Sequence, residues 1–249
     1  MRKTIQRVFN YMGFELVKTK HLLNMTDMEG SFLEMYQICK PYTMTSVERM
    51  YAIYKSIEYI GLNKIDGDIV ECGVWKGGSS MMAALSLKHF HNITKNLYLY
   101  DTFEGMSEPG VHDRNLSNEP ADKEYRESML ESGISSWCYS SLEEVKGNMQ
   151  KTGYPEMNIH YIKGKVEDTI PGAIPGEISL LRLDTDWYES TLHGLNHLFP
   201  LLKKGGILIL DDYGHWQGAR KATDEYFAKE KIYPFLSRID YTGRAYIKY

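Results

Sequence analysis

The feature that most constrains this fold is a pair of short apolar runs, 178–183 and 207–210, that each end in carboxylates. The carboxylates after the two runs are Asp184, Asp186, Asp211 and Asp212. Between the runs, apolar residues recur at helical spacing, namely Leu192, Leu195, Leu198, Phe199 and Leu202. A strand, a helix and a strand within about 35 residues predict a βαβ unit with two parallel, buried strands.

Four aspartates are therefore expected at one edge of a parallel sheet, because the carboxyl ends of parallel strands meet there. This edge is where open α/β sheets bind their ligands. Carboxylates that lie close together repel one another, and a divalent cation is the simplest compensation. The pattern predicts a cation site at the sheet edge.

The composition is that of a water-soluble globular chain with room for one sizeable domain. It has 249 residues, of which 43% are hydrophobic, and a net charge of −4, which gives no general affinity for nucleic acid. Its three cysteines are widely spaced and odd in number, which argues against a disulfide framework and for a reducing compartment. We find no signal peptide and no apolar run of transmembrane length, and we expect a cytoplasmic protein.

The first 20 residues have the pattern of a basic amphipathic helix. Its apolar face would consist of Ile5, Val8, Phe9, Met12 and Leu16. Such a helix can lie on an anionic membrane surface, which would make the protein membrane-peripheral. The alternative, which we favour, is packing against the domain or against a partner subunit.

The remaining elements alternate between helix and strand. We predict an amino-terminal helical extension over 1–66, with a helix that Thr45 and Ser46 cap and Gly61 ends, and a main domain over 67–249. The expected strands are 68–72, 96–101, 158–163, 178–183 and 207–210, and the expected helices are 79–89, 142–149 and 224–229. A carboxyl-terminal hairpin is expected from 233–239 and 244–249. The polar stretch 104–137 reads as a lid insertion with a short helix over 123–131.

This order predicts an α/β fold, with a mostly parallel sheet of seven strands and helices on both faces. A closing hairpin on such a Rossmann-like sheet is typical of class I methyltransferases.

A glycine-rich turn between the first expected strand and its helix predicts a nucleotide-like site. Gly73 allows a sharp turn, and Gly77 and Gly78 allow a ligand to approach the start of the helix closely. Asp101 ends the second strand, where an acidic residue holds a ribose in dinucleotide sites. Glu71 would repel a pyrophosphate and attract a cationic ligand, so S-adenosyl-L-methionine fits this turn better than a dinucleotide.

Four motifs resemble those of the macrocin O-methyltransferase family, in the same order over about residues 43–227. They are GDIVECGVWKGGSS, LYDTFEGM, LRLDTDWYEST and GGILILDDYGHWQGARKATDEYF. The resemblance implies a homo-oligomeric enzyme that transfers the methyl group of S-adenosyl-L-methionine to a sugar-containing acceptor with the help of Mg²⁺. It implies Asp184, Asp211 and Asp212 as metal ligands. The implied cofactor contacts are Glu71, Gly73, Gly77, Gly78, Ser79, Asp101, Thr102, Gly164, Glu167 and Asp184.

The reaction also needs a base, because a sugar hydroxyl holds its proton far above neutral pH. Asp186 is favoured, since it would project on the same side as Asp184 if the strand geometry persisted. His215 is the alternative, because it titrates near neutrality. The acceptor can be a glycan, a nucleotide sugar or a glycosylated natural product, and the basic start of the chain favours a cell-surface glycan precursor. A catechol-like O-methyltransferase and a non-catalytic S-adenosyl-L-methionine-binding protein stay open as other readings.

Overall fold

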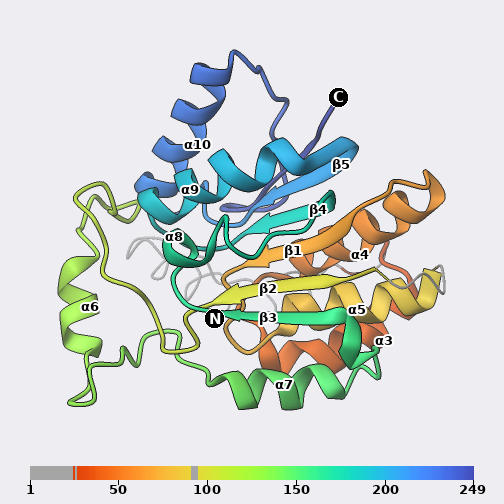
Figure 1. Cartoon of the computed structure of the whole chain (residues 1–249), viewed down its shortest axis with the longest axis horizontal. Coiled ribbons are helices and arrows are strands. Elements are labelled where there is room, and N and C mark those ends of the chain that lie inside the picture. Colours follow the sequence, from red (N-terminus) through yellow and green to blue (C-terminus); the bar gives the residue numbers. More distant parts are fainter. Residues whose placement is uncertain (1–24, 26, 91–94) are drawn as a thin grey trace, which may run out of the picture.

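The structure, a computed structural model, describes residues 25, 27–90 and 95–249, and its centre is one sheet of seven strands. The strand order is β3-β2-β1-β4-β5-β7-β6 (Figure 1). The strands are β1 (Asp68–Cys72), β2 (Leu97–Asp101), β3 (Ile159–Lys163), β4 (Ile178–Leu183), β5 (Leu202–Leu210), β6 (Ser237–Arg238) and β7 (Arg244–Ile247). The first five are parallel, and β7 and β6 pair antiparallel at the edge next to β5. The predicted seven-stranded, mostly parallel sheet is confirmed.

Apolar side chains alternate along the central strands, so each face of the sheet has its own core. On one face, Ile69 and Leu180 pack with α3 (Gly30–Cys39), α4 (Val47–Leu62), α5 (Gly78–Phe90) and α7 (Leu142–Gln150). On the other face, Val70 and Leu181 pack with α8 (Val166–Thr169), α9 (Tyr188–Leu198) and α10 (Gln217–Glu230). Period-two alternation puts neighbouring residues on opposite faces, and helices cover both.

Several boundaries differ from the predicted ones, each for a local reason. Leu202 was expected on the crossover helix, but that helix stops at Leu198 and a single 3₁₀ turn with Pro200 precedes β5, which starts at Leu202. The second strand of the βαβ unit is therefore longer than 207–210. Helix α4 runs one residue past Gly61, and α10 begins at Gln217, well before the predicted 224.

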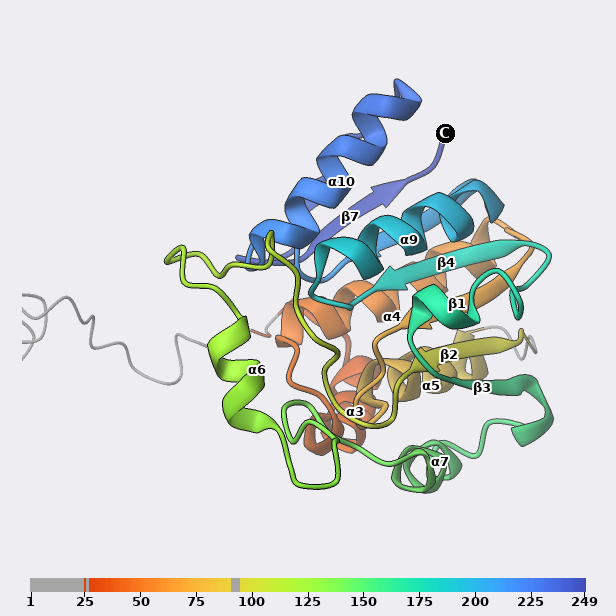
Figure 2. The same cartoon turned by 60° about the vertical axis from the view of Figure 1, so that its left-hand side comes forward.

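The segment 104–137 lies beyond the carboxyl ends of the strands and holds the short helix α6 (Asp122–Ser128), slightly earlier than predicted. Figures 1 and 2 show α6 at the end of the molecule toward which the arrows of β1, β2 and β4 point. Trp187 and Trp216, at the starts of α9 and α10, pack with Met106 and Trp137 of this region. The predicted helix within residues 1–20 lies outside the described residues, and no helix of the described part is long and apolar enough to cross a membrane.

Candidate active site

The carboxylates that follow β4 and β5 gather at the sheet edge. Asp184, Asp211 and Asp212 each offer an oxygen, and these oxygens lie within 4.8 Å of one another. The backbone holds the loops in register, because the Asp184 amide donates to the Cys72 carbonyl at 2.8 Å and the Asp211 amide donates to the Leu183 carbonyl at 2.9 Å. Three acidic groups this close form a donor set of the kind that hard divalent cations take.

Arg182, on β4, lies beneath this cluster and compensates part of its charge. Its Nη2 donates to Asp211 at 2.6 Å and pairs with Asp184 at 2.8 Å, and its Nη1 contacts Glu71 and Ser79. Its side chain is only 3% exposed, so these contacts are shielded from solvent. A buried arginine on a parallel strand requires such partners, because an unpaired buried charge is costly.

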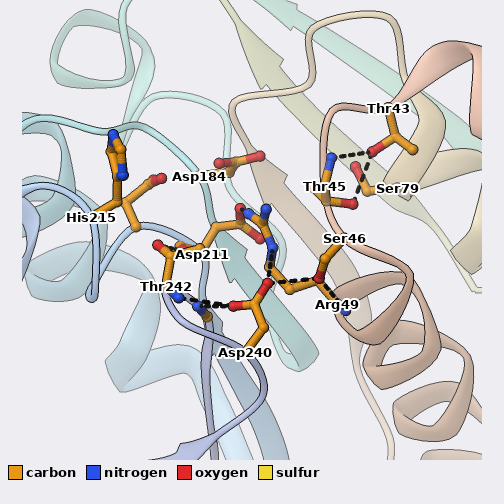
Figure 3. Close-up of polar contacts among 12 residues, drawn as sticks. Thr43, Thr45, Ser46, Arg49, Ser79, Asp184, Asp211, His215, Asp240 and Thr242 are labelled. Atoms are coloured by element: carbon orange, nitrogen blue, oxygen red, sulfur yellow. Dashed lines mark hydrogen bonds and ion pairs between the residues drawn. The ribbon is translucent and has the colours of Figure 1, made fainter. Parts of the chain in front are cut away.

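Arg49 reaches the same cluster from the first turn of α4 (Figure 3). Its Nη1 forms an ion pair with Oδ2 of Asp211, and its Nε donates to Asp240 at 3.0 Å. Asp240 lies in the β6–β7 turn and also accepts from Ser46, the cap residue of α4, at 2.6 Å. The start of α4 and the β6–β7 turn, far apart in the sequence, are thus joined through Asp240.

Burial and mutual repulsion dominate the electrostatics of the acidic groups. Burial raises the pKa of Asp184 and of Asp212 well above the usual range. Burial, followed by repulsion from Asp184, raises the pKa of Asp186 to about 8. Carboxylates whose pKa values are raised in this way are under-compensated, and a bound cation would relieve the repulsion.

Asp186 reaches the pocket by a route that the sequence did not predict. Strand geometry does not persist past Leu183, and Asp186 has a left-handed φ of 61°. The turn nevertheless directs Asp186 into the pocket, and its amide donates to Asp212 at 3.1 Å. Asp186 does not cap α9, because the first helical amide, that of Tyr188, donates to Asp113 at 2.8 Å.

His215 follows the aspartate pair but stands apart from the lining of the pocket. Its ring faces Tyr241, with 3.5 Å between its Nδ1 and the tyrosine hydroxyl, and it stacks edge-on against Trp216. Burial, together with the positive charge of Arg49, lowers the pKa of His215. The structure thus brings Asp186, rather than His215, together with the three predicted metal ligands.

The pocket has two adjoining parts. Both include the end of β1 and part of the acidic edge, which is the sheet edge that carries Asp184, Asp186, Asp211 and Asp212. The first part is lined by Thr43, Thr45, Arg49, Trp75, Ser79, Cys138, Asp184, Asp186, Asp211 and Asp212, among others. The second is lined by Thr102, Ser107, Gly164, Lys165, Glu167 and Ser190, among others. Both parts are lined by Gly73, Asp101, Gly105, Met106, Asp184 and Asp186. The predicted residues Thr102, Gly164 and Glu167 are therefore together in the second part.

The glycine turn packs so closely on the acidic edge that Gly73 tolerates no side chain. Its φ is +85°, and a Cβ there would come within 1.8 Å of the carbonyl oxygen of Asp184. Asp101 fixes the same turn, because it accepts from the amides of Val74 at 2.7 Å and Trp75 at 3.0 Å. Gly73 and Asp101 thus line the pocket, and their contact with a cofactor stays a prediction.

Three other residues that were predicted to contact the cofactor, Glu71, Gly77 and Gly78, do not line the pocket. Glu71 is buried beneath the pocket, where it contacts Ser79, Ser80 and Arg182, and it is not among the lining residues. Gly77 and Gly78 are also outside the lining. A Cβ at Gly78 would come within 2.6 Å of the carbonyl oxygen of Tyr42, so this glycine serves packing against the segment before α4.

Sequence reasoning missed the two arginines of the site, although both left a local signal. Arg182 is a charge within an otherwise apolar parallel strand, ISLLRL. Arg49 is a cation in the first turn of a helix, the end that favours anions. Neither signal indicates which carboxylate pairs with the arginine. Arg49 and Asp211, for example, are 162 residues apart in the sequence.

Known proteins with similar sequences support one assignment. Residues 34–248 match the family model described as macrocin-O-methyltransferase. The chain is 32% identical over 202 residues to the 8-demethyl-8-(2,3-dimethoxy-alpha-L-rhamnosyl)-tetracenomycin-C 4'-O-methyltransferase of Streptomyces olivaceus, covering 81% of this chain and 74% of the relative. It is 31% identical over the same length to the demethyldecarbamoylnovobiocin O-methyltransferase of Streptomyces niveus, with the same shares of each chain covered.

A solved structure agrees with this assignment. The O-methyltransferase NovP superposes with a TM-score of 0.70 at 28% sequence identity, over 83% of this chain and 82% of that one. The residues that the family model matches, 34–248, include all seven strands and the aspartates that follow β4 and β5. The chain therefore belongs to the macrocin O-methyltransferase family.

Proposed function

We propose that this protein methylates a hydroxyl group of a sugar, with S-adenosyl-L-methionine as methyl donor and a divalent cation, Mg²⁺, at the acidic edge. The observation that carries the proposal is the position of the three-aspartate cluster in the same pocket as the glycine turn at the end of β1. Methyl transfer requires that the donor and the metal-bound hydroxyl lie next to each other. The pocket places the glycine turn, for the donor, beside the three aspartates, for the cation.

The donor's site is supported by the two-part pocket. Gly73 and Asp101, at the carboxyl ends of β1 and β2, stand where this type of sheet receives a nucleoside. Thr102, Gly164 and Glu167 extend that part toward β3 and would border the adenosine. When bound, S-adenosyl-L-methionine supplies a methyl group on a positively charged sulfur, and the acidic surroundings favour that charge.

The cation site is supported by the chemistry of its donors. Asp184, Asp211 and Asp212 would hold Mg²⁺, which takes oxygen ligands from a few carboxylates and leaves positions for substrate oxygens. When bound, such a cation orients neighbouring hydroxyl groups and lowers the pKa of one of them. The protein's part is to hold the three carboxylates in register on the ends of two strands.

For the base we propose Asp186. Its side chain lines both parts of the pocket beside Asp184, whereas His215 lines neither. A base has to lie within hydrogen-bond reach of the proton that it removes. As the oxygen–carbon bond forms and the carbon–sulfur bond breaks, the hydroxyl proton would pass to the Asp186 carboxylate.

For the acceptor we propose a sugar of a glycosylated natural product, because the tetracenomycin relative is named for methylation of a rhamnosyl compound. Catechol-like methylation is the second candidate, since adjacent phenolic hydroxyls bind a cation in the same way. The nucleotide sugar and glycan precursors that the sequence suggested belong in the same acceptor screen.

The test is turnover of S-adenosyl-L-methionine against glycosylated natural products, nucleotide sugars, glycans and catechols, each with Mg²⁺ and with chelator. We expect methylation of a sugar hydroxyl that depends on Mg²⁺. The Asp212→Asn variant should lose that metal-dependent turnover and keep most of its affinity for the donor, because Asp212 lies outside the second part of the pocket. Full activity in chelator would contradict the cation role, and activity on catechols alone would favour the second candidate.

A further inference from the structure

Asp211 differs from the other two candidate ligands because guanidinium groups occupy both of its carboxylate oxygens. Nη2 of Arg182 lies 2.6 Å from Oδ1, and Nη1 of Arg49 contacts Oδ2. Asp212, by comparison, accepts the backbone amide of Asp186 at Oδ2, and no arginine of the described residues forms an ion pair with it. A divalent cation that uses Asp211 must therefore share it with an arginine or displace one.

Arg182 is held too firmly to be displaced. Its two terminal nitrogens contact Glu71, Ser79, Asp184 and Asp211, and its side chain is 3% exposed. If it left these partners, Glu71 and Asp184 would lose the arginine that pairs with them, and Asp211 would lose one of its two. Such a rearrangement is costly in a low-dielectric interior.

Arg49 has the freedom that Arg182 lacks. Its Nε bonds to Asp240, which would keep the guanidinium anchored if Nη1 left Asp211. Its Nη2 has no hydrogen-bond partner among the residues that the structure describes, and the side chain lines the pocket at 11% exposure. Figure 3 shows Asp240 and Asp211 on the two sides of this guanidinium.

The location of Arg49 is otherwise unfavourable. It lies in the first turn of α4, where the helix dipole disfavours a positive charge, and burial disfavours the charge further. The carboxylates of Asp211 and Asp240 offset both costs. The positive charge of Arg49 is therefore explained by the carboxylates that it neutralises.

We propose that Arg49 is the internal counter-ion of the cation site: it occupies Oδ2 of Asp211 in the metal-free protein, and a divalent cation binds by taking that place. The inference rests on the proposed function, because it takes the three aspartates as the metal ligands. Arg49 then competes with the metal for Asp211, and its guanidinium stays paired with Asp240 when the metal binds.

The experiment measures the dissociation constant of Mn²⁺, a paramagnetic substitute for Mg²⁺, by electron paramagnetic resonance without donor or acceptor. Arg49→Gln should bind Mn²⁺ about tenfold more tightly than the wild type, since a neighbouring positive charge and a competing partner are both removed. A purely structural ion pair would give lower thermal stability and no gain in affinity. Arg49→Lys, which keeps the charge, should stay close to the wild type.

The matched control is Lys76→Gln, which removes one positive charge beside the pocket residue Trp75 without touching an aspartate of the site. Its Mn²⁺ affinity should stay within about twofold of the wild type. If Lys76→Gln tightens binding as much as Arg49→Gln, the effect is general electrostatics and the inference is overturned.

A second variant covers the case in which Arg49→Gln does not fold. Asp240→Asn removes the alternative partner of Arg49 but keeps an acceptor for the amides of Thr242 and Gly243. Arg49 should then hold Asp211 more strongly, and Mn²⁺ should bind about threefold more weakly. Unchanged binding by Asp240→Asn would overturn the inference in that case.

The outcomes separate the inference from the function on which it rests. Equal or weaker binding by Arg49→Gln, with a wild type that binds Mn²⁺, overturns the counter-ion role and leaves the proposed cation site standing. No binding by either protein removes the cation site itself, and the counter-ion role with it.

Discussion

Asp101 holds the turn that follows β1 and also faces both parts of the pocket. One carboxylate oxygen accepts the amides of Val74 and Trp75, and the other accepts the amide of Phe103 at 2.7 Å. A single side chain thus shapes two loops that would border the donor. Its loss should affect binding more than folding, because the loops lie at the edge of the sheet.

We predict that Asp101→Asn lowers the affinity for S-adenosylhomocysteine at least about tenfold, because an amide accepts fewer and weaker hydrogen bonds than a carboxylate. Isothermal titration calorimetry measures the affinity. Glu104→Gln is the matched control, since it removes a nearby carboxylate that, among the described residues, forms an ion pair only with the exposed Lys163. Unchanged affinity of Asp101→Asn would show that the residue has no part in the donor site.

The choice of base can also be decided residue by residue. We expect Asp186→Asn to reduce the rate of methylation by about 10²- to 10⁴-fold and to abolish the rise of the rate with pH. His215→Asn should keep the shape of the pH profile, because His215 lies outside the pocket lining. A flat profile for His215→Asn alone would reverse the assignment.

Neither arginine of the site was predicted, whereas the aspartates were, and the difference is physical. The aspartates follow apolar strands, so their position is set by local pattern and by the rule that parallel strands end together. The contacts of Arg49 and Arg182 depend on distant segments that sequence pattern does not pair. A buried charge can be recognised as needing a partner, but which carboxylate it meets follows only from the packing of α4 on the sheet.

At the scale of elements, the insertion 104–137, which we predict to be a lid, is fixed to the starts of α9 and α10. Asp113 is 1% exposed, and it accepts from the amides of Gly110 at 2.6 Å and Tyr188 at 2.8 Å, so a lid residue caps α9. The amide of Gln217, the first residue of α10, donates to the carbonyl of Arg114 at 2.8 Å. The clamp leaves no space at Gly218, where a Cβ would lie 2.0 Å from Oδ1 of Asp113.

We predict that Gly218→Ala expels Asp113 and loosens the lid, at a cost of about 1–3 kcal/mol in the free energy of unfolding. Trypsin should cleave the lid faster at Lys123 and Arg126, which are exposed on α6. Gly147→Ala is the control, because nothing lies within 4 Å of a Cβ there and alanine favours its helix. Equal cleavage rates in the two variants would argue against a clamp.

Element types were more predictable than their ends. The βαβ unit, the glycine turn and the terminal hairpin follow from periodicity and from glycine positions. Leu202 was misplaced because an apolar residue after a helix fits a helical face as well as the start of a strand, and Pro200 in the intervening turn decides the matter. The clamp by Asp113 was not predicted, since an aspartate in a polar insertion carries no local sign of burial.

At the scale of the whole molecule, the acidic edge sets how stability depends on pH. The pKa of Asp186 is raised to about 8, so the metal-free folded state binds more protons than the unfolded state between the ordinary aspartate pKa and about pH 8. Stability therefore falls as pH rises through this window. Asp184 and Asp212, whose pKa values are also raised by burial, add to the effect in the same direction.

We predict that Mg²⁺ raises the midpoint of thermal unfolding more at pH 8.0 than at pH 5.5, with both compared against chelator. At pH 8.0 more of these carboxylates are ionised than at pH 5.5, so a bound cation relieves more repulsion. Because the cation binds the folded state and not the unfolded state, this binding raises stability. Scanning calorimetry gives the midpoints, and Asp212→Asn should remove most of the difference. A larger gain at pH 5.5 would contradict the raised pKa values.

The buried guanidinium of Arg182 joins Glu71, on β1 beneath the proposed donor site, to two of the proposed metal ligands, Asp184 and Asp211, and this bears on redesign. A new acceptor preference would be sought first in the lid and in residues 42–45, whose side chains border the pocket from outside the sheet. Changes to β1, β4 or β5 would disturb donor and metal at once. Laboratory evolution of this scaffold should accordingly accumulate its tolerated substitutions in those two peripheral segments.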